Sequence, residues 1–273
     1  MSNNKEGGLR PPSLHMSNPS RQLNEKMPKT IPPKQLERLL RERKVVDQQT
    51  LDGESFRGER WPDFVAIGST FNHCDFSNTR FEQACFGGGI DQSRYVDCCF
   101  DGAEIYASAP GNARFERCTF RNAKIQVFRG IDAEFIDCLF SGVIKKGFFN
   151  GTPLQDRPTR PPSREYNEFR GNDFSSAKLL DVSFRTGIDL HLQQLPKGDD
   201  YIYAEDGRRF VQNLPSIELT EKYGNHFSAI ERVLQMKLDG GQRQIFLSIK
   251  GFPVGQRAML THLKRIAEGN LLA

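Results

Sequence analysis

Large apolar side chains recur every five residues over much of the chain, a spacing that neither an α-helix nor a flat strand produces. A helix repeats its faces every 3.6 residues and a strand every two. The five-residue period therefore predicts a chain that turns a corner after each unit of five. The apolar positions that follow this period are Phe71, Phe76, Phe81, Phe86, Tyr95, Phe100, Ile105, Phe115, Phe120, Ile125, Phe135, Phe140, Phe169, Phe174, Leu179 and Phe184.

A second, longer period is superimposed on the first. Cys98, Cys118 and Cys138 fall twenty residues apart, and each is followed two positions later by phenylalanine. Two inward side chains in each unit of five, with four units to a turn, predict a four-sided coil of twenty residues. Successive coils would stack as parallel strands about 4.8 Å apart, so that equivalent side chains form interior columns.

These columns define the predicted core. Free thiols are favoured over disulfides at the inward cysteines, because these occupy the slot that alanine and serine fill elsewhere. Disulfides are the alternative, since adjacent coils would bring the cysteines of the longer period within bridging range. The predicted core ladder consists of Cys74, Phe76, Cys98, Phe100, Cys118, Phe120, Cys138, Phe140 and Phe174.

Four five-residue units carry the repeat most clearly, each with a small residue first and phenylalanine in the centre. They begin at Cys74, Ala84, Cys118 and Asn172. In this pattern the chain resembles the pentapeptide-repeat family over about residues 51–190. The resemblance implies a mainly β fold, a right-handed four-sided parallel β-helix of about six coils.

The register of the repeat slips at two places. Phe71 and Tyr95 are twenty-four residues apart, and the excess coincides with Gly87 to Ile90, which predicts a glycine bulge. A longer excess falls within residues 145–168 and predicts an extruded, proline-rich loop. This loop is the first candidate contact site, and a tolerated surface insertion is the alternative. Its candidate partner-binding residues are Lys145, Lys146, Arg157, Arg160 and Arg164.

The flanks of the repeat follow other patterns. Residues 1–34 are rich in proline, Asn, Ser and Lys and lack apolar periodicity, which predicts a disordered tail. Residues 35–50 are assigned to a capping helix that runs to about Val46, because an open β-helix end exposes unpaired strand edges. Residues 191–273 predict an α-rich C-terminal module. We interpret it as a cap that also provides a dimer contact, or alternatively as a separate partner-binding module.

Within that module the patterns predict individual elements. A strand is expected at residues 201–204 and an amphipathic helix around Phe227 to Leu234. A second helix is expected from Pro253 to Gly269, since proline opens helices and glycine ends them. Residues 244–249 fit either a strand or an apolar helical turn.

Charge is unevenly distributed along the chain. Residues 1–50 hold ten basic against five acidic residues, whereas residues 51–190 hold seventeen basic against twenty acidic. The family resemblance implies one further role, because its best-known branch mimics duplex DNA with an acidic rod and so protects or inhibits DNA gyrase. Six coils spanning about 29 Å would need about seventeen negative charges to match DNA. The small acidic excess falls short of this unless the carboxylates cluster on one side.

The sequence contains no catalytic or cofactor motif. It lacks a phosphate-cradling loop, a zinc-protease helix, a nucleophile elbow and a dinucleotide fingerprint. The five histidines are dispersed, and no CxxC pair or histidine spacing indicates a metal site. Polysaccharide cleavage by outward Asp and Arg residues is known in other parallel β-helices, but ordinary ion pairs explain the alternating charges here. We therefore expect no enzyme, no cofactor and no metal.

These patterns predict a non-catalytic, cytoplasmic bacterial protein, a rigid solenoid that binds an unidentified protein partner of an immunity or regulatory type. No run of eighteen apolar residues and no hydrophobic signal core is present, so neither a membrane anchor nor export is expected. The alternatives are a gyrase-directed DNA mimic and a purely structural solenoid, with a homodimer formed through the C-terminal module. Binding to nucleic acid is not expected, because a basic tail is usually a solvated terminus.

Overall fold

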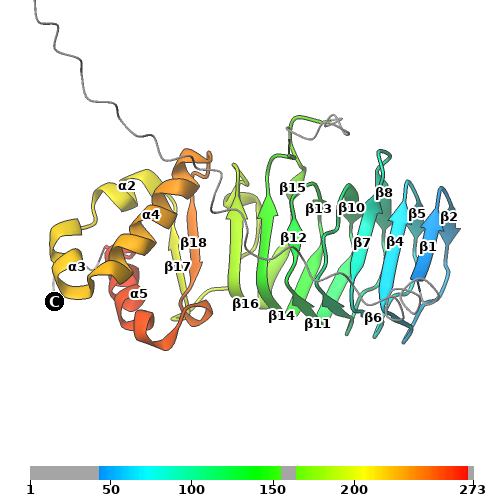
Figure 1. The fold of residues 1–273 in the computed structure, drawn as a ribbon, viewed down its shortest axis with the longest axis horizontal. Coiled ribbons are helices and arrows are strands. Elements are labelled where there is room, and N and C mark those ends of the chain that lie inside the picture. Colours follow the sequence, from blue (N-terminus) through cyan, green and yellow to red (C-terminus); the bar gives the residue numbers. More distant parts are fainter. Residues whose placement is uncertain (1–42, 155–163, 270–273) are drawn as a thin grey trace, which may run out of the picture. The chain divides into compact units, whose positions relative to one another are not determined.

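The repeat region forms a mainly β, parallel solenoid that is followed by an α-rich module (Figure 1). The computed structural model describes residues 43–154 and 164–269. The tail predicted for residues 1–34 lies outside the described residues. Along the solenoid, successive strands of each sheet lie parallel to one another, from β1 and β2 in blue to β16 in yellow-green.

Three parallel sheets make up the solenoid. The first consists of β1 (Arg43–Asp47), β4 (Asp63–Ile67) and β7 (Ala84–Gly88). The second consists of β2 (Thr50–Asp52), β5 (Thr70–Asn72), β8 (Ser93–Val96), β10 (Ala113–Glu116), β13 (Glu134–Ile136) and β15 (Phe169–Arg170). The third consists of β3 (Arg60–Trp61), β6 (Arg80–Phe81), β9 (Glu104–Tyr106), β11 (Thr119–Gln126), β12 (Arg129–Gly130), β14 (Leu139–Asn150) and its neighbour β16 (Asp173–Arg185).

The strand register confirms the predicted twenty-residue turn. Tyr95 pairs with Phe115, and Phe115 pairs with Phe135. Across the two predicted slips, Phe71 still pairs with Tyr95 and Phe135 with Phe169. The six levels of the second sheet are separated by about five turns. The two insertions therefore leave the columns in register.

The residues of the predicted core ladder all lie inside the solenoid. None of their side chains is more than 3% exposed. The Phe120 ring stacks between those of Phe100 and Phe140, with centroids 4.8 Å away on each side and interplanar angles of 8° and 6°. Each such ring is buried between the equivalent rings of the coil above and the coil below. Burial and ring stacking therefore stabilise the same column.

The inward cysteines are free thiols that interact with the preceding coil. The Sγ atom of Cys98 lies 3.3 Å from the carbonyl oxygen of Phe71, and that of Cys118 lies 3.3 Å from the carbonyl oxygen of Tyr95. Burial is the main cause that raises the pKa of the Cys74 thiol to about 11. A thiol with this pKa keeps its proton at neutral pH and can donate it to a carbonyl oxygen.

The chain turns its corners at residues with left-handed backbone conformation. His73, Asp97, Arg117 and Asp137 have φ values between 51° and 54° and occupy equivalent positions in successive coils. Asn, Asp and His tolerate this conformation better than most non-glycine residues do. Val127 also adopts it, with φ of 55°, although a β-branched side chain is strained there. Left-handed corners at Asp97, Gly102 and Ala107, and one coil later at Arg117, Asn122 and Val127, lie five residues apart and so give the chain its five-residue period.

The solenoid begins earlier in the chain than predicted. Residues 43–47 form strand β1, which pairs in parallel with β4. The predicted capping helix of residues 35–50 is therefore wrong from Arg43 onward, and its earlier part lies outside the described residues. Val45 is 47% exposed whereas Val46 is buried in the solenoid core, an alternation typical of a strand. Leucines at helical spacing just before this segment obscured that alternation.

The C-terminal module combines a hairpin-like pair of strands with helices. Strand β17 (Tyr201–Ala204) pairs antiparallel with β18 (Ile245–Ser248), so the ambiguous residues 244–249 form mainly a strand. The helices are α2 (Gly207–Gln212), α3 (Ser216–Tyr223), α4 (Asn225–Asp239) and α5 (Val254–Ala267), with 3₁₀ turns η2 (Leu190–Leu192) and η3 (Ile249–Gly251). Strand β17 and helices α4 and α5 confirm the predicted elements. The short helices α2 and α3 were not predicted, although Asp206, whose side chain caps α2, was a signal for the first.

None of the helices in the described part of the chain combines the length and the apolar character that crossing a membrane requires.

The module covers the last coil of the solenoid through side chains that follow α4. Phe246 of β18 belongs to the same core cluster as the solenoid rings, and its ring meets that of Phe184 edge-on at 5.9 Å. Gln242 Nε2 donates to the carbonyl oxygen of Ile188 at 2.8 Å, and Gln244 Nε2 donates to Asp189 Oδ1 at 3.0 Å. The module thus acts as the cap that an open solenoid end requires.

Candidate binding surface

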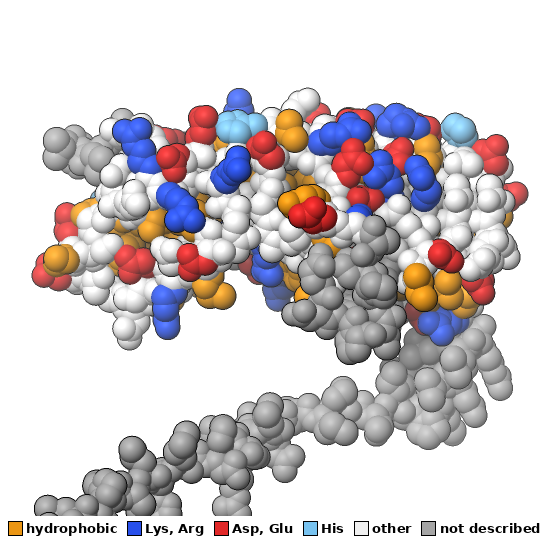
Figure 2. Space-filling view, turned by 90° about the horizontal axis from the view of Figure 1, so that it is seen from above, with side chains coloured by type: hydrophobic (Ala, Val, Ile, Leu, Met, Phe, Trp, Pro, Cys, Tyr) orange, Lys and Arg blue, Asp and Glu red, His pale blue; other side chains and the backbone are white. Residues whose placement is uncertain are grey.

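Outward charged side chains of the solenoid pair from one coil to the next. Arg117 donates through Nε and Nη2 to the two carboxylate oxygens of Asp97, each at 2.8 Å, and Lys124 Nζ lies 2.8 Å from Glu104 Oε1. These hydrogen bonds are the main cause that lowers the pKa of Asp97 and of Glu104. Figure 2 shows basic and acidic side chains interspersed over the face that it displays.

Arg114 is the centre of the densest ion-pair network. Its Nη1 atom lies 3.2 Å from Glu134 Oε2 and 2.7 Å from Glu168 Oε2, and its Nε atom donates to Glu116. The hydrogen bond from Arg114 is the main cause that lowers the pKa of Glu168. Carboxylates paired in this way offer little uncompensated charge. In the described residues the pairing weighs against a surface that imitates DNA.

The insertion begins later in the chain than predicted. Strand β14 runs to Asn150, so Lys145 and Lys146 lie on an ordered coil and not in the loop. The insertion begins at Gly151, and the coil resumes with Phe169 in β15. The proline-rich character of the later residues hid the continued five-residue period of Ile144 and Phe149, both of which lie in the solenoid core.

Arg164 fixes the return of the insertion to the solenoid. Its Nη1 donates to Asn112 Oδ1 at 2.7 Å, its Nε donates to Asn167 Oδ1 at 3.1 Å, and its Nη2 donates to the carbonyl oxygen of Asp132. Glu134 Oε1 lies 3.3 Å from the same Nε, and the Arg164 side chain is only 19% exposed. The insertion therefore has a rigid base.

Three large apolar side chains are exposed around this base. Ile90 is 70% exposed, Leu154 46% and Tyr166 64%. The carbonyl oxygen of Ile90 accepts a hydrogen bond from Asn112 Nδ2 at 2.9 Å, and the backbone N–H of Leu154 donates to Asp132 Oδ1 at 2.9 Å. Asn112, which accepts from Arg164 of the insertion, thus also holds the earlier glycine bulge. We call Ile90, Leu154 and Tyr166 the corner platform.

The glycine bulge is fixed by a close approach to the next coil. Gly87 pairs with Gly111, and a Cβ atom on Gly87 would lie 2.3 Å from the carbonyl carbon of Asn112. No side chain other than hydrogen fits there. The pairing of Ile67 with Gly88 is shifted relative to that of Val65, which confirms the predicted bulge.

The sequence-predicted contact residues that the structure describes have different roles. Lys145 and Lys146 are exposed on β14, Arg164 is directed into the base of the insertion, and Arg157 and Arg160 lie outside the described residues.

The sequence analysis missed the corner platform because single apolar residues in loops give no periodic signal. A different signal was available. The bulge precedes Tyr95 and the insertion precedes Phe169, and these two rings belong to the same column. Both excursions therefore leave the coil on the same side.

Histidines of the described residues are scattered. His73 Nδ1 lies 3.0 Å from Asp52 Oδ1 at the surface, and His191 Nε2 lies 3.6 Å from Glu205 Oε1. No group of three or more His, Cys, Asp or Glu suited to a metal ion occurs in residues 43–154 and 164–269.

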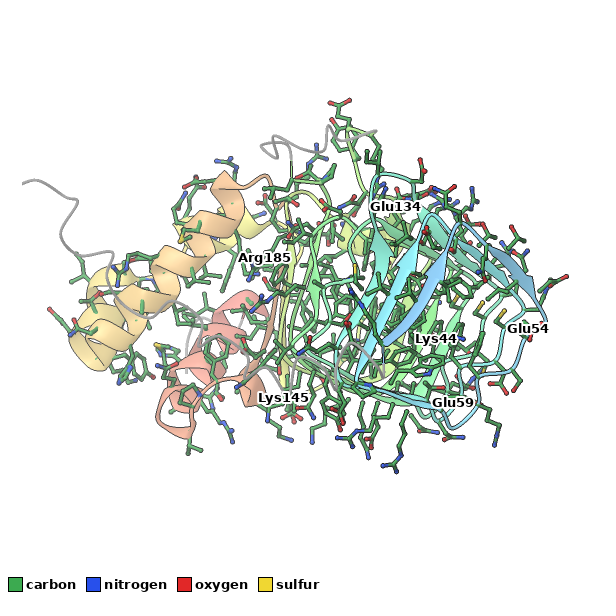
Figure 3. The ribbon with its side chains drawn as sticks, turned by 45° about the vertical axis from the view of Figure 1, so that its right-hand side comes forward. Lys44, Glu54, Glu59, Glu134, Lys145 and Arg185 are labelled. Carbon is green, nitrogen blue, oxygen red and sulfur yellow. The ribbon has the colours of Figure 1, made fainter. Side chains whose placement is uncertain are left out.

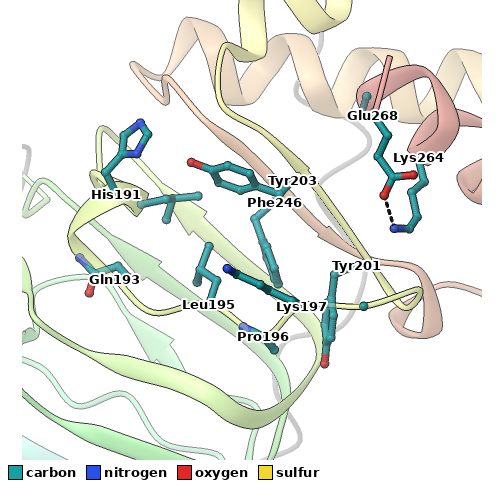
Figure 4. A pocket seen from close by; sticks show the side chains of 13 residues that line it. His191, Gln193, Leu195, Pro196, Lys197, Tyr201, Tyr203, Phe246, Lys264 and Glu268 are labelled. Atoms are coloured by element: carbon teal, nitrogen blue, oxygen red, sulfur yellow. Dashed lines mark hydrogen bonds and ion pairs between the residues drawn. The ribbon is translucent and has the colours of Figure 1, made fainter. Parts of the chain in front are cut away.

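A pocket of about 400 Å³ lies between the end of the last coil and the module (Figure 4). Its walls include the rings of Tyr201, Tyr203 and Phe246. An ion pair between Lys264 and Glu268 stands at its edge. The volume suits a small ligand.

Comparison with known proteins gives neighbours of similar fold. No family model and no curated protein matches the chain. Among solved structures it is similar to QnrB1, a plasmid-mediated fluoroquinolone resistance protein, with 16% identity, 55% of this chain and 81% of that chain covered, and a TM-score of 0.23. It is also similar to HetL from the cyanobacterium Nostoc sp. strain PCC 7120, with 10% identity, coverage of 59% and 77%, and a TM-score of 0.27. HetL is a pentapeptide repeat protein involved in heterocyst differentiation regulation.

At such identities and scores these likenesses carry no argument about function. The β-solenoid itself is shown by the chain's own five-residue repeat and by the register of its strands.

Proposed function

We propose that this solenoid is a non-catalytic scaffold that binds a protein partner through the corner platform of Ile90, Leu154 and Tyr166. The observation that carries the proposal is that two separate excursions of the chain leave the coil at one corner and expose a large apolar side chain each time. Scattered exposed apolar residues are ordinary on a protein surface, whereas a group on a rigid base is typical of an interaction site.

Two further properties support this proposal. The platform is pre-organised, because Arg164 and Asn112 hold both excursions, and a rigid site loses less entropy when it binds. Paired charges such as Arg114 with Glu168 lie in the neighbouring coils. An apolar centre with a polar surround is the usual composition of a protein interface.

The experiment that tests the proposal compares two triple variants. The platform variant carries Ile90→Ser, Leu154→Ser and Tyr166→Ser. The control carries Ile217→Ser, Met236→Ser and Val254→Ser, which alter the most exposed apolar residues of the module helices. Both variants are expected to unfold like the parent, because exposed side chains contribute little to stability.

Tagged full-length protein is used to capture partners from the native host, with quantitative mass spectrometry. We expect a stoichiometric protein partner that the control retains and the platform variant loses. The purified partner should then bind the platform variant at least tenfold more weakly than the parent. Loss of the partner with the control alone would assign binding to the module and contradict the proposal.

The alternative of a gyrase-directed DNA mimic has less support, because many described carboxylates are paired with Arg or Lys. A supercoiling assay with purified gyrase decides between the two. Protection or inhibition of gyrase that persists in the platform variant would replace the scaffold proposal.

Location and self-association belong to the same proposal. None of the six cysteines forms a disulfide in the described residues, which supports action in a reducing compartment such as the cytoplasm. Homodimer formation through the module has some support in the exposure of Ile217, Met236 and Val254, at 80%, 73% and 76%. Sedimentation of the parent and of the control variant measures it directly.

A further inference from the structure

Two cations converge on one hydroxyl group where the last coil meets helix α4. Lys237 Nζ donates to Ser183 Oγ and lies 3.5 Å from the carbonyl oxygen of Phe184. Arg185 Nε donates to the same Ser183 Oγ at 3.3 Å. The guanidinium carbon of Arg185 lies 4.2 Å from the centre of the Phe148 ring, which restrains its position. Figure 3 shows Arg185 at the end of the solenoid that carries the module.

The cations around Ser183 outnumber the carboxylates. Asp181 is the carboxylate that interacts with Arg185, and it interacts with Lys146 as well. Neither Arg185 nor Lys237 forms an ion pair with a carboxylate of residues 43–154 or 164–269 at salt-bridge distance. With one carboxylate for three basic side chains, the cluster has a net charge of about +2.

Burial makes this excess charge costly. It is the main cause that lowers the pKa of Lys237 to about 8, and the nearby Arg185 lowers it further. Burial also lowers the pKa of Arg185. A desolvated ammonium beside a second cation is unfavourable unless an anion compensates the charge.

The hydrogen bonds of the Ser183 hydroxyl group also indicate that an acceptor is missing. A hydroxyl oxygen has two lone pairs and one proton. Lys237 and Arg185 occupy the two lone pairs, so the proton of Ser183 must point to a further acceptor. No acceptor for it lies in the described residues, and the Nη atoms of Arg185 likewise have no partner there. The three side chains therefore have more donor hydrogens than the described acceptors, Ser183 Oγ and the carbonyl oxygen of Phe184, take up.

We propose that Ser183, Arg185 and Lys237, with Lys146 connected to them through Asp181, bind a tetrahedral oxyanion of the phosphate class. A doubly charged phosphate matches the net charge of the cluster, and its several oxygens can accept from an ammonium, a guanidinium and a hydroxyl group together. A carboxylate has one charge and fewer acceptor positions. The site is open to solvent, since Arg185 is exposed and Ser183 and Lys237 are half-buried.

The site is separate from the corner platform and goes beyond the proposed scaffold function. A phosphate group bound there would contact both β16 and α4 and so connect the solenoid to its cap. Ligands that bind only the folded state stabilise it, and the stabilisation grows with the logarithm of ligand concentration above the Kd. The proposed ligand would therefore stabilise the docking of the module.

Calorimetric titration of the full-length protein with inorganic phosphate tests the proposal. We expect saturable binding of one phosphate, weakened at least tenfold by Arg185→Gln or Ser183→Ala. The matched control is Arg208→Gln, which removes an exposed arginine of α2, and it should leave binding unchanged. Acetate should bind at least tenfold more weakly than phosphate. Failure of the parent to bind phosphate, or equal binding by the Arg185→Gln and Ser183→Ala variants, would overturn the proposal.

Two further measurements follow. The first detects phosphate binding in the parent protein, so that it does not depend on a variant that could misfold. The second identifies the kind of molecule to which the bound phosphate group belongs. Phosphate should slow acetylation of Lys237 by acetic anhydride, measured by peptide mass spectrometry, but not acetylation of exposed Lys222. Unchanged labelling of Lys237 would contradict the site. Tighter binding of O-phosphoserine or of a nucleoside monophosphate than of inorganic phosphate would show that the phosphate belongs to a larger ligand.

Discussion

Inside the solenoid, Phe120 has a phenylalanine stacked 4.8 Å above it and another 4.8 Å below it. We call the contact between the last coil and the module the seam. There the Phe246 ring meets that of Phe184 edge-on, with centroids 5.9 Å apart, and its other close ring is that of Tyr201 at 5.4 Å. The interior contact is repeated in coil after coil, whereas the seam contact occurs once. A repeated contact can be inferred from sequence spacing, but a single one requires the three-dimensional structure.

Polar groups differ between the two regions in the same way. In the interior, thiols in one column each reach the backbone of the preceding coil, as Cys98 and Cys118 do. At the seam, Gln242, Gln244 and Lys237 each make a different hydrogen bond to the last coil. The interior is therefore uniform and the seam is specific, and the two should respond differently to mutation and to pH.

The largest effect is expected from a charge placed inside the column. Phe120→Asp would bury a carboxylate between two stacked rings that offer it no hydrogen bond. An unpaired buried charge costs more than the whole stability of most domains. We expect loss of the cooperative unfolding transition, measured by circular dichroism during heating.

The control for this change is Arg121→Gln at the next position. Arg121 makes an exposed pair with Asp101, so the expected loss of stability is below about 1 kcal/mol. A Phe120→Asp protein that unfolds like the parent would show that this side chain does not point inward.

A substitution at the seam should have a smaller effect on stability and should make the unfolding of the two regions less cooperative. Phe246→Ala removes a ring that is 3% exposed and should destabilise the protein by about 3 kcal/mol. The module should then unfold before the solenoid. Fluorescence of Trp61, the single tryptophan and part of the solenoid, reports one region, and helical circular dichroism reports the other.

Guanidinium unfolding followed by both signals makes the test. Met236→Ala, at a module side chain 73% exposed, is the control and should leave the transitions coincident. Coincident transitions in Phe246→Ala as well would mean that this ring does not couple the two regions.

The pH dependence of stability should have opposite signs in the two regions. The pKa of Lys237 falls from its ordinary 10.5 to about 8, so between these values the unfolded chain binds more protons and stability rises with pH. The pKa of Cys74 rises from its ordinary 9.0 to about 11, so its contribution is lost as pH rises through that range.

Urea unfolding at pH 8 and pH 10 separates the two contributions. Relative to the parent, Lys237→Met should remove the rise, and Cys74→Ala should remove the loss. Parallel pH profiles for the parent and Lys237→Met would contradict the lowered pKa at the seam.

The smallest predicted effect concerns a corner of the solenoid. Val127 adopts a φ of 55°, which costs a β-branched residue about 1 kcal/mol relative to asparagine. Val127→Asn should therefore raise the free energy of unfolding by about that amount. Val127→Ala keeps a Cβ atom at the same φ and should give less than half of the gain, as urea unfolding can measure.

The sequence predicted the interior well because every coil repeats the same environment. The spacing of Cys98, Cys118 and Cys138 was enough to place these side chains inward and in one column. The prediction from sequence pattern failed at β1, where the repeat had not yet begun and leucines at helical spacing preceded Val45 and Val46. Strand pairing with β4 decides the structure of that segment, and local periodicity does not report such pairing.

The candidate sites were harder to predict for a different reason. Ile90 and Leu154 are far apart in sequence and share one corner of the solenoid only because both excursions leave the coil there. Ser183 and Lys237 come from different regions of the chain that share no period. The positive charge of Lys145 and Lys146 was noticed, but the length of β14 that places them on an ordered coil was not.

The shared corner has a consequence for how such a protein can change. The chain gains four residues at one level and about fourteen at another, yet Phe71, Tyr95, Phe135 and Phe169 keep their places in the column. Insertions and deletions at this corner are therefore decoupled from the core. New recognition segments could be grafted there, by evolution or by a protein engineer, without redesigning a single interior side chain.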